Sequence, residues 1–215
     1  MKNIIKLIFL IIKKNFFPTF MYWDSTYKFT TNFINQRKEL EIGLEIGVAG
    51  GFHIKSILEN TSVKKMFGVD PYLFYGGPEE KAFHNDVKKL FGYKKKDTSL
   101  QTMQEAFDKL YEKTRQMLSA YQDRCFLIRK TAEDACEDFK DSSLDFVFID
   151  GAHDYKNAYV DISLYYPKVK TGGYIMGHDF NEKMFPGVVK AVKEYFELEE
   201  ILVDSNSTCW YVKKS

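Results

Sequence analysis

Two short apolar runs of this chain each end abruptly in polar residues. The run 144–149 is rich in β-branched and aromatic side chains and stops at Asp150, as a buried strand does. The run 174–176 follows a helix-like segment and a pair of glycines, and it stops at His178 and Asp179. A strand, a helix and a strand in this order form a right-handed crossover with parallel strands. Both polar tips are therefore expected at one carboxyl edge of a sheet, where open α/β sheets bind ligands.

The chain length and the remaining pattern define the expected fold. The 215 residues suffice for one α/β domain and are too few for two ordinary ones. Near the C-terminus, 201–203 and 209–212 are strand-like runs around a polar turn, which predicts an antiparallel hairpin. The expected fold class is α/β, with a Rossmann-like, mostly parallel sheet, helices on both faces and a C-terminal antiparallel hairpin.

Charge and cysteine content exclude several classes of protein. The formal net charge of +1 creates no field that would recruit nucleic acid or an anionic membrane. The three cysteines are an odd number and lack the spacing of a disulfide framework or a zinc site. We therefore expect a cytoplasmic protein without a nucleic-acid partner.

Residues 1–39 are interpreted as an N-terminal arm ahead of a domain at 40–215. The arm has a basic start and an apolar middle, like a signal peptide, but Lys6 interrupts it. Its apolar stretch 7–12 is far shorter than the roughly 20 residues that span a bilayer, so no transmembrane span is expected. We expect the arm to pack on its own domain or on the second subunit of a homodimer; the alternative is a peripheral position on a membrane surface.

A glycine-rich turn follows the first strand expected in the domain. Glu45 lies near the end of that strand, and Gly47 and Gly51 bound the turn before a helix begins. A strand, a glycine turn and a helix N-terminus let backbone N–H groups approach a nucleotide-type cofactor closely. A dinucleotide fingerprint needs a third glycine where this chain has Phe52, and a phenylalanine there blocks close packing of the helix on the strand. A nicotinamide oxidoreductase is therefore disfavoured.

The next expected strand contributes another candidate binding residue. The strand 66–69 ends in Asp70, and a carboxylate at that tip can accept hydrogen bonds from both hydroxyls of a ribose. The alternative is a turn-forming aspartate before a proline. Residues 72–121 then form a long insertion at the ligand edge, which we interpret as a lid.

The polar tips of the crossover carry the residue types of a metal site. Asp150, His178 and Asp179 offer two hard carboxylates and an imidazole, which suit Mg²⁺, Mn²⁺ or Fe²⁺. His153 begins the following helix, and an imidazole there can take a proton from a hydroxyl. The alternative for each of these side chains is a helix cap or an ordinary hydrogen bond.

Residues 40–212 resemble class I S-adenosylmethionine-dependent methyltransferases. The resemblance rests on Glu45, Gly47, Gly51 and Asp70 and on the segments 149–155 and 172–180. It points to the subfamily of catechol and caffeoyl-CoA O-methyltransferases and, more closely, to bacterial enzymes that O-methylate sugars of macrolides and glycans. The resemblance implies that Glu45 and the two glycines admit the methionine portion of the cofactor, and that Asp70 binds the ribose. It also makes Thr131 and Ala132 candidates for contact with the adenine; the alternative for Thr131 is a helix N-cap.

The same resemblance implies roles at the polar tips. Asp150 and Asp179 would hold a divalent metal with His178 as the third ligand, and His153 would be the general base. Catechol-type relatives carry a lysine in the base position, so His153 favours the sugar-modifying branch. His178 departs from the pattern, because most metal-dependent relatives carry an acidic residue there. Without a metal, His153 and Asp150 would act as a base and its orienting carboxylate.

The sequence thus predicts an O-methyltransferase that uses S-adenosylmethionine and a divalent metal such as Mg²⁺, and that acts on a hydroxyl of a sugar or glycan. The first alternative is a catechol-like or other small hydroxylated acceptor. The second is a non-catalytic scaffold in glycan assembly, against which the retained Glu45, Gly47 and Gly51 speak.

Overall fold

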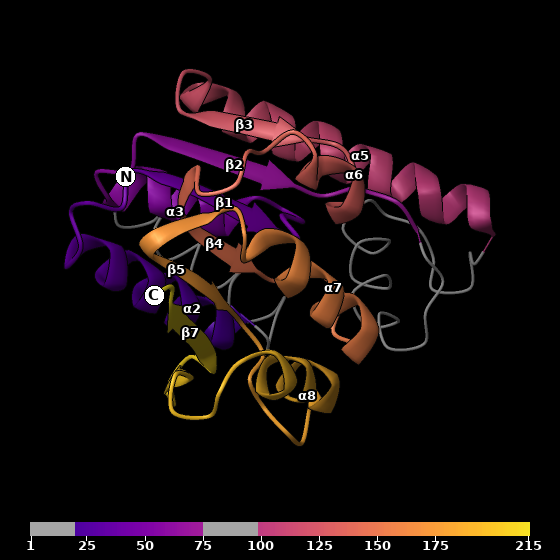
Figure 1. Cartoon of the computed structure of the whole chain (residues 1–215). Helices are drawn as coiled ribbons and strands as arrows, with labels where there is room; N and C mark the ends of the chain where they lie inside the picture. The colour runs from indigo at the N-terminus through magenta and orange to yellow at the C-terminus, as the bar shows by residue number, and fades with distance from the viewer. Residues whose placement is uncertain (1–19, 75–98) are drawn as a thin grey trace.

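The computed structural model of the protein describes residues 20–74 and 99–215. They form a seven-stranded sheet in the order β3-β2-β1-β4-β5-β7-β6 (Figure 1). β1 to β5 run parallel, and β7 pairs antiparallel with β5 and with β6. The strands are β1 Ile42–Ile46, β2 Lys65–Val69, β3 Cys125–Ile128, β4 Leu144–Ile149, β5 Val169–Gly177, β6 Leu202–Asp204 and β7 Cys209–Lys213. The predicted fold class is confirmed.

Helices cover both faces of this sheet (Figure 1). They are α2 Phe20–Asn35, α3 Phe52–Asn60, α5 Leu100–Leu118, α6 Ala132–Cys136, α7 Tyr155–Tyr165 and α8 Pro186–Tyr195, with a 3-10 turn η1 at Ser119–Tyr121. α2 and α3 contribute to one apolar core, and α6, α7 and α8 to the other. Because strand side chains alternate between faces, Leu44 and Ile46 of β1 pack into the core that α6, α7 and α8 cover, whereas Glu45 faces α3.

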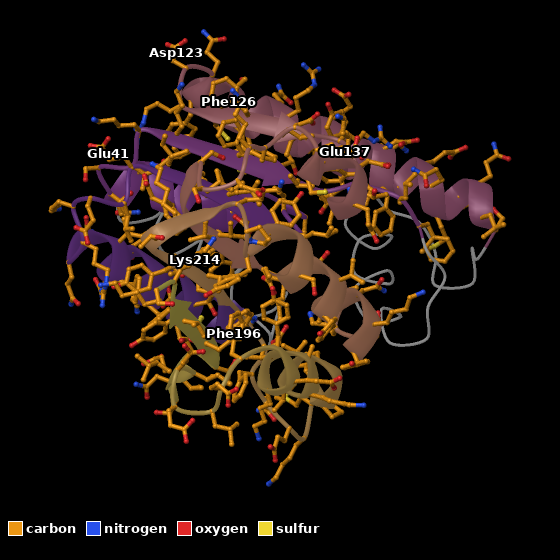
Figure 2. All side chains as sticks on the ribbon, in the orientation of Figure 1. Glu41, Asp123, Phe126, Glu137, Phe196 and Lys214 are labelled. Carbon is orange, nitrogen blue, oxygen red and sulfur yellow. The ribbon has the colours of Figure 1, made fainter. Side chains whose placement is uncertain are left out.

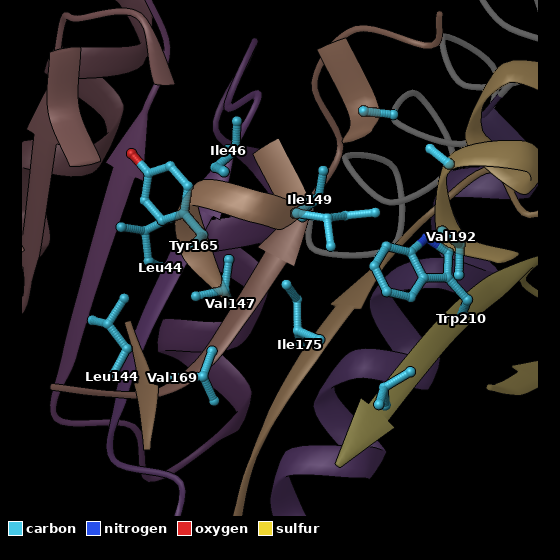
Figure 3. Close-up of a cluster of buried hydrophobic side chains, with 14 of the residues drawn as sticks. Leu44, Ile46, Leu144, Val147, Ile149, Tyr165, Val169, Ile175, Val192 and Trp210 are labelled. Carbon is cyan, nitrogen blue, oxygen red and sulfur yellow. The ribbon is translucent and has the colours of Figure 1, made fainter. Parts of the chain in front are cut away.

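The core beneath α7 and α8 is filled by aliphatic side chains of the central strands. Leu44, Val147 and Ile175 are 0% exposed and lie in one row across β1, β4 and β5 (Figure 3). Full burial of one such side chain contributes about 1.5–3 kcal/mol. Trp210 of β7 closes the far end of the cluster beside Val192 (Figure 3). These contacts hold the ends of the central strands in a fixed position.

The two edges of the sheet are short strands. On β3, Phe126 is 39% exposed (Figure 2). Its ring stacks on that of Phe67, with centroids 5.3 Å apart. At the opposite edge, β6 has 3 residues, of which Leu202 and Val203 are exposed. Short edge strands limit pairing with other chains.

The crossover formed by β4, α7 and β5 is present as predicted, but the start of β5 differs from the prediction. The sequence indicated a strand from residue 174, whereas β5 begins at Val169. Gly172 N–H donates to Lys214 O at 2.8 Å, and Lys214 N–H donates to Gly173 O at 2.9 Å. This pairing with the C-terminal segment keeps the glycines in the sheet despite their low strand propensity.

Several predictions fall wholly or partly outside the described residues. These are the arm at 1–19 and the segment 75–98 of the predicted lid. The described part of the arm forms α2, which packs into the core near α3 through Phe33 and Ile34. The lid, the homodimer and the membrane-surface position stay predictions. Among the described residues, no helix combines the length and the apolar character needed to cross a membrane.

Asp161 of α7 is a buried carboxyl, 6% exposed, and burial raises its pKa from 3.8 to about 8. Between these two pH values the folded protein keeps a proton that the unfolded chain has lost. Through this group the free energy of unfolding should therefore fall by about 1.4 kcal/mol for each pH unit of increase. We expect Asp161→Asn to be more stable than the parent at about pH 9 and close to it at about pH 4, as measured by urea unfolding.

Asp145 of β4 provides the matched control for this prediction. It is also buried, 8% exposed, but its Oδ2 accepts hydrogen bonds from the N–H groups of Glu41 at 2.9 Å and Ile42 at 2.7 Å. Lys170 Nζ lies 2.6 Å from its Oδ1. Asp145→Asn should therefore destabilise the protein by about 1–3 kcal/mol at neutral pH. An Asp161→Asn variant that is less stable than the parent at the higher pH would contradict the raised pKa.

Candidate active site

The strands β1, β4 and β5 end level with one another. Ile46 pairs with Ile149, and Ile149 pairs with Gly177. Just beyond the strands, Asp150 N–H donates to Ile46 O at 2.8 Å and His178 N–H donates to Ile149 O at 3.1 Å. The structure thus brings the polar residues that follow β4 and β5 together at the carboxyl edge of the sheet.

Asp150, His153 and Asp179 form a compact group of potential ligands. One ligand atom of each lies within 4.8 Å of the others, and His153 Nε2 is 2.8 Å from Asp179 Oδ2. Asp179 has φ +62, an uncommon conformation for a non-glycine residue that is often found at functional sites. Burial opposes its ionisation, but hydrogen bonds from His153 and His178 lower its pKa to about 2. Two carboxylates and an imidazole at this spacing fit a hard divalent cation.

His178 lies behind this group and contacts both carboxylates. Its Nδ1 is 3.1 Å from Asp179 Oδ1 and 3.6 Å from Asp150 Oδ1. The ring is 7% exposed, and its Nε2 has no hydrogen-bond partner among the described residues. Burial disfavours the imidazolium, but the hydrogen bonds to Asp150 and Asp179 outweigh this and raise the pKa of His178 to about 10. His178 thus links the two carboxylates.

The two histidines are therefore placed differently from the predicted arrangement. The sequence-based prediction made His178 the third metal ligand and His153 the base, whereas the compact group contains His153 and leaves His178 out. The physical reason is that His178 directly continues β5 and is buried behind the strand tips, while His153 lies on the more exposed loop before α7. The individual roles of both histidines stay predictions.

The position of His153 depends on a segment that the sequence reasoning did not single out. The His153 ring packs on Phe185 with centroids 4.7 Å apart. A Cβ at Gly187 would lie 2.7 Å from His153 O and 2.6 Å from Tyr155 N. A glycine at this place in the first turn of α8 lets that helix approach the loop closely. The sequence signal for this segment was the tripeptide Phe185-Pro186-Gly187, which stands before a helical pattern.

The glycine turn after β1 is pressed against the tip of β4. Gly47 has φ +84, and a Cβ on it would lie 2.0 Å from Asp150 O. Gly51 has φ +72 at the N-cap of α3, and a Cβ there would lie 2.7 Å from Thr114 Cγ2 of α5. Both glycines are therefore required by conformation and by space, which explains this part of the motif independently of any ligand.

Asp70 organises the same turn. Its carboxylate accepts hydrogen bonds from Ala49 N–H at 2.9 Å and from Tyr72 N–H at 2.7 Å. Burial raises the pKa of Asp70, and its backbone hydrogen bonds act against that rise. A carboxylate has about four lone-pair sites, so these two contacts leave capacity for the predicted ribose contact.

The insertion after β2 is tied to the glycine turn by specific contacts. Ala49 O accepts hydrogen bonds from the hydroxyls of Tyr72 and Thr114, each at 2.9 Å. Tyr72 packs in a small apolar core with Phe107 and other residues of α5. α5 therefore supports the turn, through the Ala49 carbonyl and through the packing of Thr114 against Gly51.

The predicted adenine contacts lie at the start of α6. Thr131 is the N-cap of this helix, and its hydroxyl accepts a hydrogen bond from Asp134 N–H at 3.1 Å. Ala132 O accepts a hydrogen bond from the hydroxyl of Tyr165 at 2.9 Å. The capping interpretation of Thr131 is thus present in the structure, and the adenine contact stays a prediction for both residues.

Glu45 has a buried partner that the sequence reasoning missed. Glu45 is 1% exposed, His53 of α3 is 5% exposed, and His53 Nδ1 lies 3.5 Å from Glu45 Oε1. Both residues point into the face of the sheet that α2 and α3 cover. The only sequence signal was a histidine two residues after the last glycine of the turn.

Comparison with known proteins gives a family match. A family described as "Methyltransferase domain" matches residues 40–180. A curated relative, uncharacterized protein R132 of Acanthamoeba polyphaga mimivirus, is 29% identical over 152 residues, which cover 70% of this chain and 57% of that protein. The chain therefore spans little more than half the length of this relative.

Solved structures with the same fold include several methyltransferases. An O-methyltransferase from Bacillus cereus in complex with S-adenosylhomocysteine has a TM-score of 0.57 and 15% identity, covering 88% of this chain and 81% of that one. Methyltransferase PaMTH1 of Podospora anserina, also bound to S-adenosylhomocysteine, has a TM-score of 0.58 and 15% identity, with coverage of 88% and 78%. The O-methyltransferase NovP has a TM-score of 0.58 and 19% identity, with coverage of 86% and 79%.

The contact between Gly47 and the β4 tip can be tested by substitution. We expect Gly47→Ala to destabilise the protein by about 3 kcal/mol, because a Cβ both strains the positive φ and overlaps a backbone carbonyl. Gly172→Ala is the matched control, since Gly172 has a similar φ of +83 but a Cβ on it would meet nothing within 4 Å. It should cost only about 1 kcal/mol. Equal losses in urea unfolding would show that the close approach is unimportant.

Proposed function

This chain belongs to the family of methyltransferase domains, with the class I fold that uses S-adenosylmethionine, and from this premise we propose that it methylates a hydroxyl group of a small molecule. The observation that carries the proposal is the group Asp150, His153 and Asp179, with its ligand atoms within 4.8 Å of one another. It lies at the carboxyl edge of the sheet, beside the glycine turn. It supplies acid–base groups next to the place where such folds hold their cofactor.

The cofactor half of the proposed site is formed by β1, β2 and the start of α6. Gly47 and Gly51 allow the turn to approach the methionine portion of S-adenosylmethionine, and Asp70 is positioned to accept hydrogen bonds from the ribose hydroxyls. Thr131 and Ala132 are proposed to border the adenine. Asp70 has a second role in this half, because its carboxylate accepts a hydrogen bond from Ala49 N–H and so fixes the turn.

The acceptor half is formed by the tips of β4 and β5. Methyl transfer from a sulfonium is an in-line displacement, so the protein has to hold the acceptor oxygen at about 3–3.5 Å and remove its proton. His153 is proposed as the base, and Asp179, at 2.8 Å from its Nε2, orients the ring and stabilises the imidazolium that forms. A divalent cation held by Asp150 and Asp179 would lower the pKa of a coordinated hydroxyl.

The acceptor is proposed as a small hydroxylated molecule, with a sugar or glycan as the narrower hypothesis. A hydroxyl acceptor is supported by the base and carboxylates at the edge, and by the shared fold with structures named as O-methyltransferases. The sugar is supported only by the resemblance of the histidine-containing motif around His153 to sugar-modifying enzymes. A catechol-like acceptor fits the same group of side chains.

We expect His153→Ala to reduce turnover at least 100-fold, roughly the usual contribution of a positioned acid–base group, while the affinity for S-adenosylhomocysteine stays within about threefold. Turnover is measured as S-adenosylhomocysteine formed with panels of sugars and catechols, and binding by calorimetry. Tyr155→Phe is the matched control, because it removes only the hydrogen bond from Tyr155 to Glu194. Equal loss of binding and turnover in His153→Ala would refute the assigned role.

Removal of metal separates two versions of the mechanism. We expect turnover to be lost in EDTA and restored by Mg²⁺, with Asp150→Asn needing more Mg²⁺ for half-maximal rate, because one hard ligand is weakened. Binding of S-adenosylhomocysteine should be the same with and without EDTA. Full turnover in EDTA would instead assign the chemistry to His153 and its carboxylate alone.

A further inference from the structure

A small cavity adjoins the loop that carries His153. Its volume is about 10 Å³, close to the space that one water molecule needs. It is lined by residues at the tips of β4 and β5, among them Asp150, His178 and Asp179, by apolar side chains of α7 and α8, and by Trp210 of β7. The cavity therefore connects the C-terminal hairpin with the carboxylates of the proposed acceptor half.

Two buried polar atoms belong to the side chains that line this cavity. Trp210 is 1% exposed and His178 is 7% exposed, and neither Trp210 Nε1 nor His178 Nε2 has a hydrogen-bond partner among the residues that the structure describes. The other ring nitrogen of His178 is turned to the carboxylates, with Nδ1 3.1 Å from Asp179 Oδ1. Buried polar groups are normally paired with protein atoms or with ordered water. An indole N–H and an imidazole nitrogen at one small cavity therefore indicate a shared polar ligand.

The packing of Trp210 on β5 brings its N–H near a backbone carbonyl as well. Trp210 pairs with Gly177 across β5 and β7, and a Cβ on Gly177 would lie 2.7 Å from Trp210 Nε1 and 2.6 Å from Ile149 O. The glycine lets the indole approach, and both atoms border the same space. Ile149 O accepts a hydrogen bond from His178 N–H at 3.1 Å, and a carbonyl oxygen has a second lone pair. A donor and an acceptor thus lie close together beside β5.

We propose, on the basis of the function proposed above, that one water molecule in this cavity joins Trp210 to His178 and makes Trp210 a positioning residue for the two carboxylates. The water accepts from Trp210 Nε1–H, pairs with His178 Nε2 and donates to Ile149 O. Three partners are the usual number for a buried water. Because water both donates and accepts, it pairs with Nε2 whether or not that nitrogen carries a proton.

The bridge restrains the imidazole of His178 at both of its nitrogens. Nδ1 contacts Asp150 and Asp179, and the water holds Nε2. Groups that orient the residues around a metal or a base determine how well those residues act. β7, which lies near the end of the chain, thereby helps to set the geometry of the acceptor half.

The water can be observed directly through the indole N–H. The chain has two tryptophans, so Trp23→Phe leaves Trp210 as the single source of an indole N–H signal. In the ¹⁵N-labelled full chain we expect a rotating-frame cross-peak between this N–H and water, with the sign of a dipolar contact and not that of hydrogen exchange. Absence of the cross-peak would overturn the water site.

A matched pair of variants at His178 tests the second partner of the water. His178→Leu removes the ring nitrogen and should abolish the cross-peak. His178→Gln should retain it, because an amide keeps both a donor and an acceptor. A cross-peak that persists in His178→Leu, or that is lost in both variants, would contradict the bridge. Urea unfolding verifies that the variants are folded.

Trp210→Phe tests the positioning role, because it keeps an aromatic ring and removes the N–H. By calorimetry with Mn²⁺ alone, we expect about 3- to 10-fold weaker binding, less than the roughly 10- to 100-fold for groups that contact a metal ligand directly. The affinity for S-adenosylhomocysteine should stay unchanged. Phe196→Leu is the matched control, since Phe196 is 6% exposed in the same core, with ring centroids 6.3 Å from Trp210, and has no polar side-chain atom. It should leave both affinities unchanged.

The outcomes separate this proposal from the proposed function. Unchanged Mn²⁺ affinity in Trp210→Phe, or equal losses in Trp210→Phe and Phe196→Leu, would overturn the positioning role. A parent protein that binds no Mn²⁺ would refute the metal of the proposed function and the positioning role together. A parent that binds S-adenosylhomocysteine and Mn²⁺ but shows no cross-peak to water would refute the bridge and leave the proposed function intact.

Discussion

The close approach of the β1 and β4 tips is the constraint on which the rest of the site depends. Gly47 lies so near the backbone of Asp150 that a single Cβ would overlap its carbonyl. This contact is possible only because both strands end at the same level and the apolar core holds them there. It places the glycine turn of the proposed cofactor half directly beside the polar group of the proposed acceptor half. In the proposed function a methyl group passes between these two halves, and the packing of the backbone sets the distance between them.

Electrostatic compensation is the second feature of the edge. A carboxylate lies at or just after the end of each of β1, β2, β4 and β5. A histidine follows within a few residues of the end of β1, β4 and β5. His178 lies behind Asp150 and Asp179 and contacts both carboxylates, and His53 lies beside Glu45. Asp70 is instead held by backbone N–H groups. Asp70, Asp150 and Asp179 thus all have polar partners, whereas Glu45 Oε2 has no hydrogen-bond partner among the described residues.

The sequence by itself determined the fold class, the crossover and the set of residues that meet at the carboxyl edge. Apolar runs ending in Asp150 and His178, and the turn bounded by Gly47 and Gly51, are local patterns, and the rule that parallel strands end at one edge connects them. The start of β5 was not predictable in this way, because it depends on the pairing of Val169 with Leu144 and of the glycines with Lys214 at the other end of the chain.

Only the tertiary structure decided which histidine faces which carboxylate. His153 and His178 have similar sequence contexts, but packing on Phe185 places one in the group with Asp150 and Asp179, and burial places the other behind it. His53 carried no signal of its own, since its contact with Glu45 arises from the packing of α3 on the sheet. Local sequence patterns specify strands and turns, whereas the direction of a side chain at a strand tip depends on neighbours that are distant in the sequence.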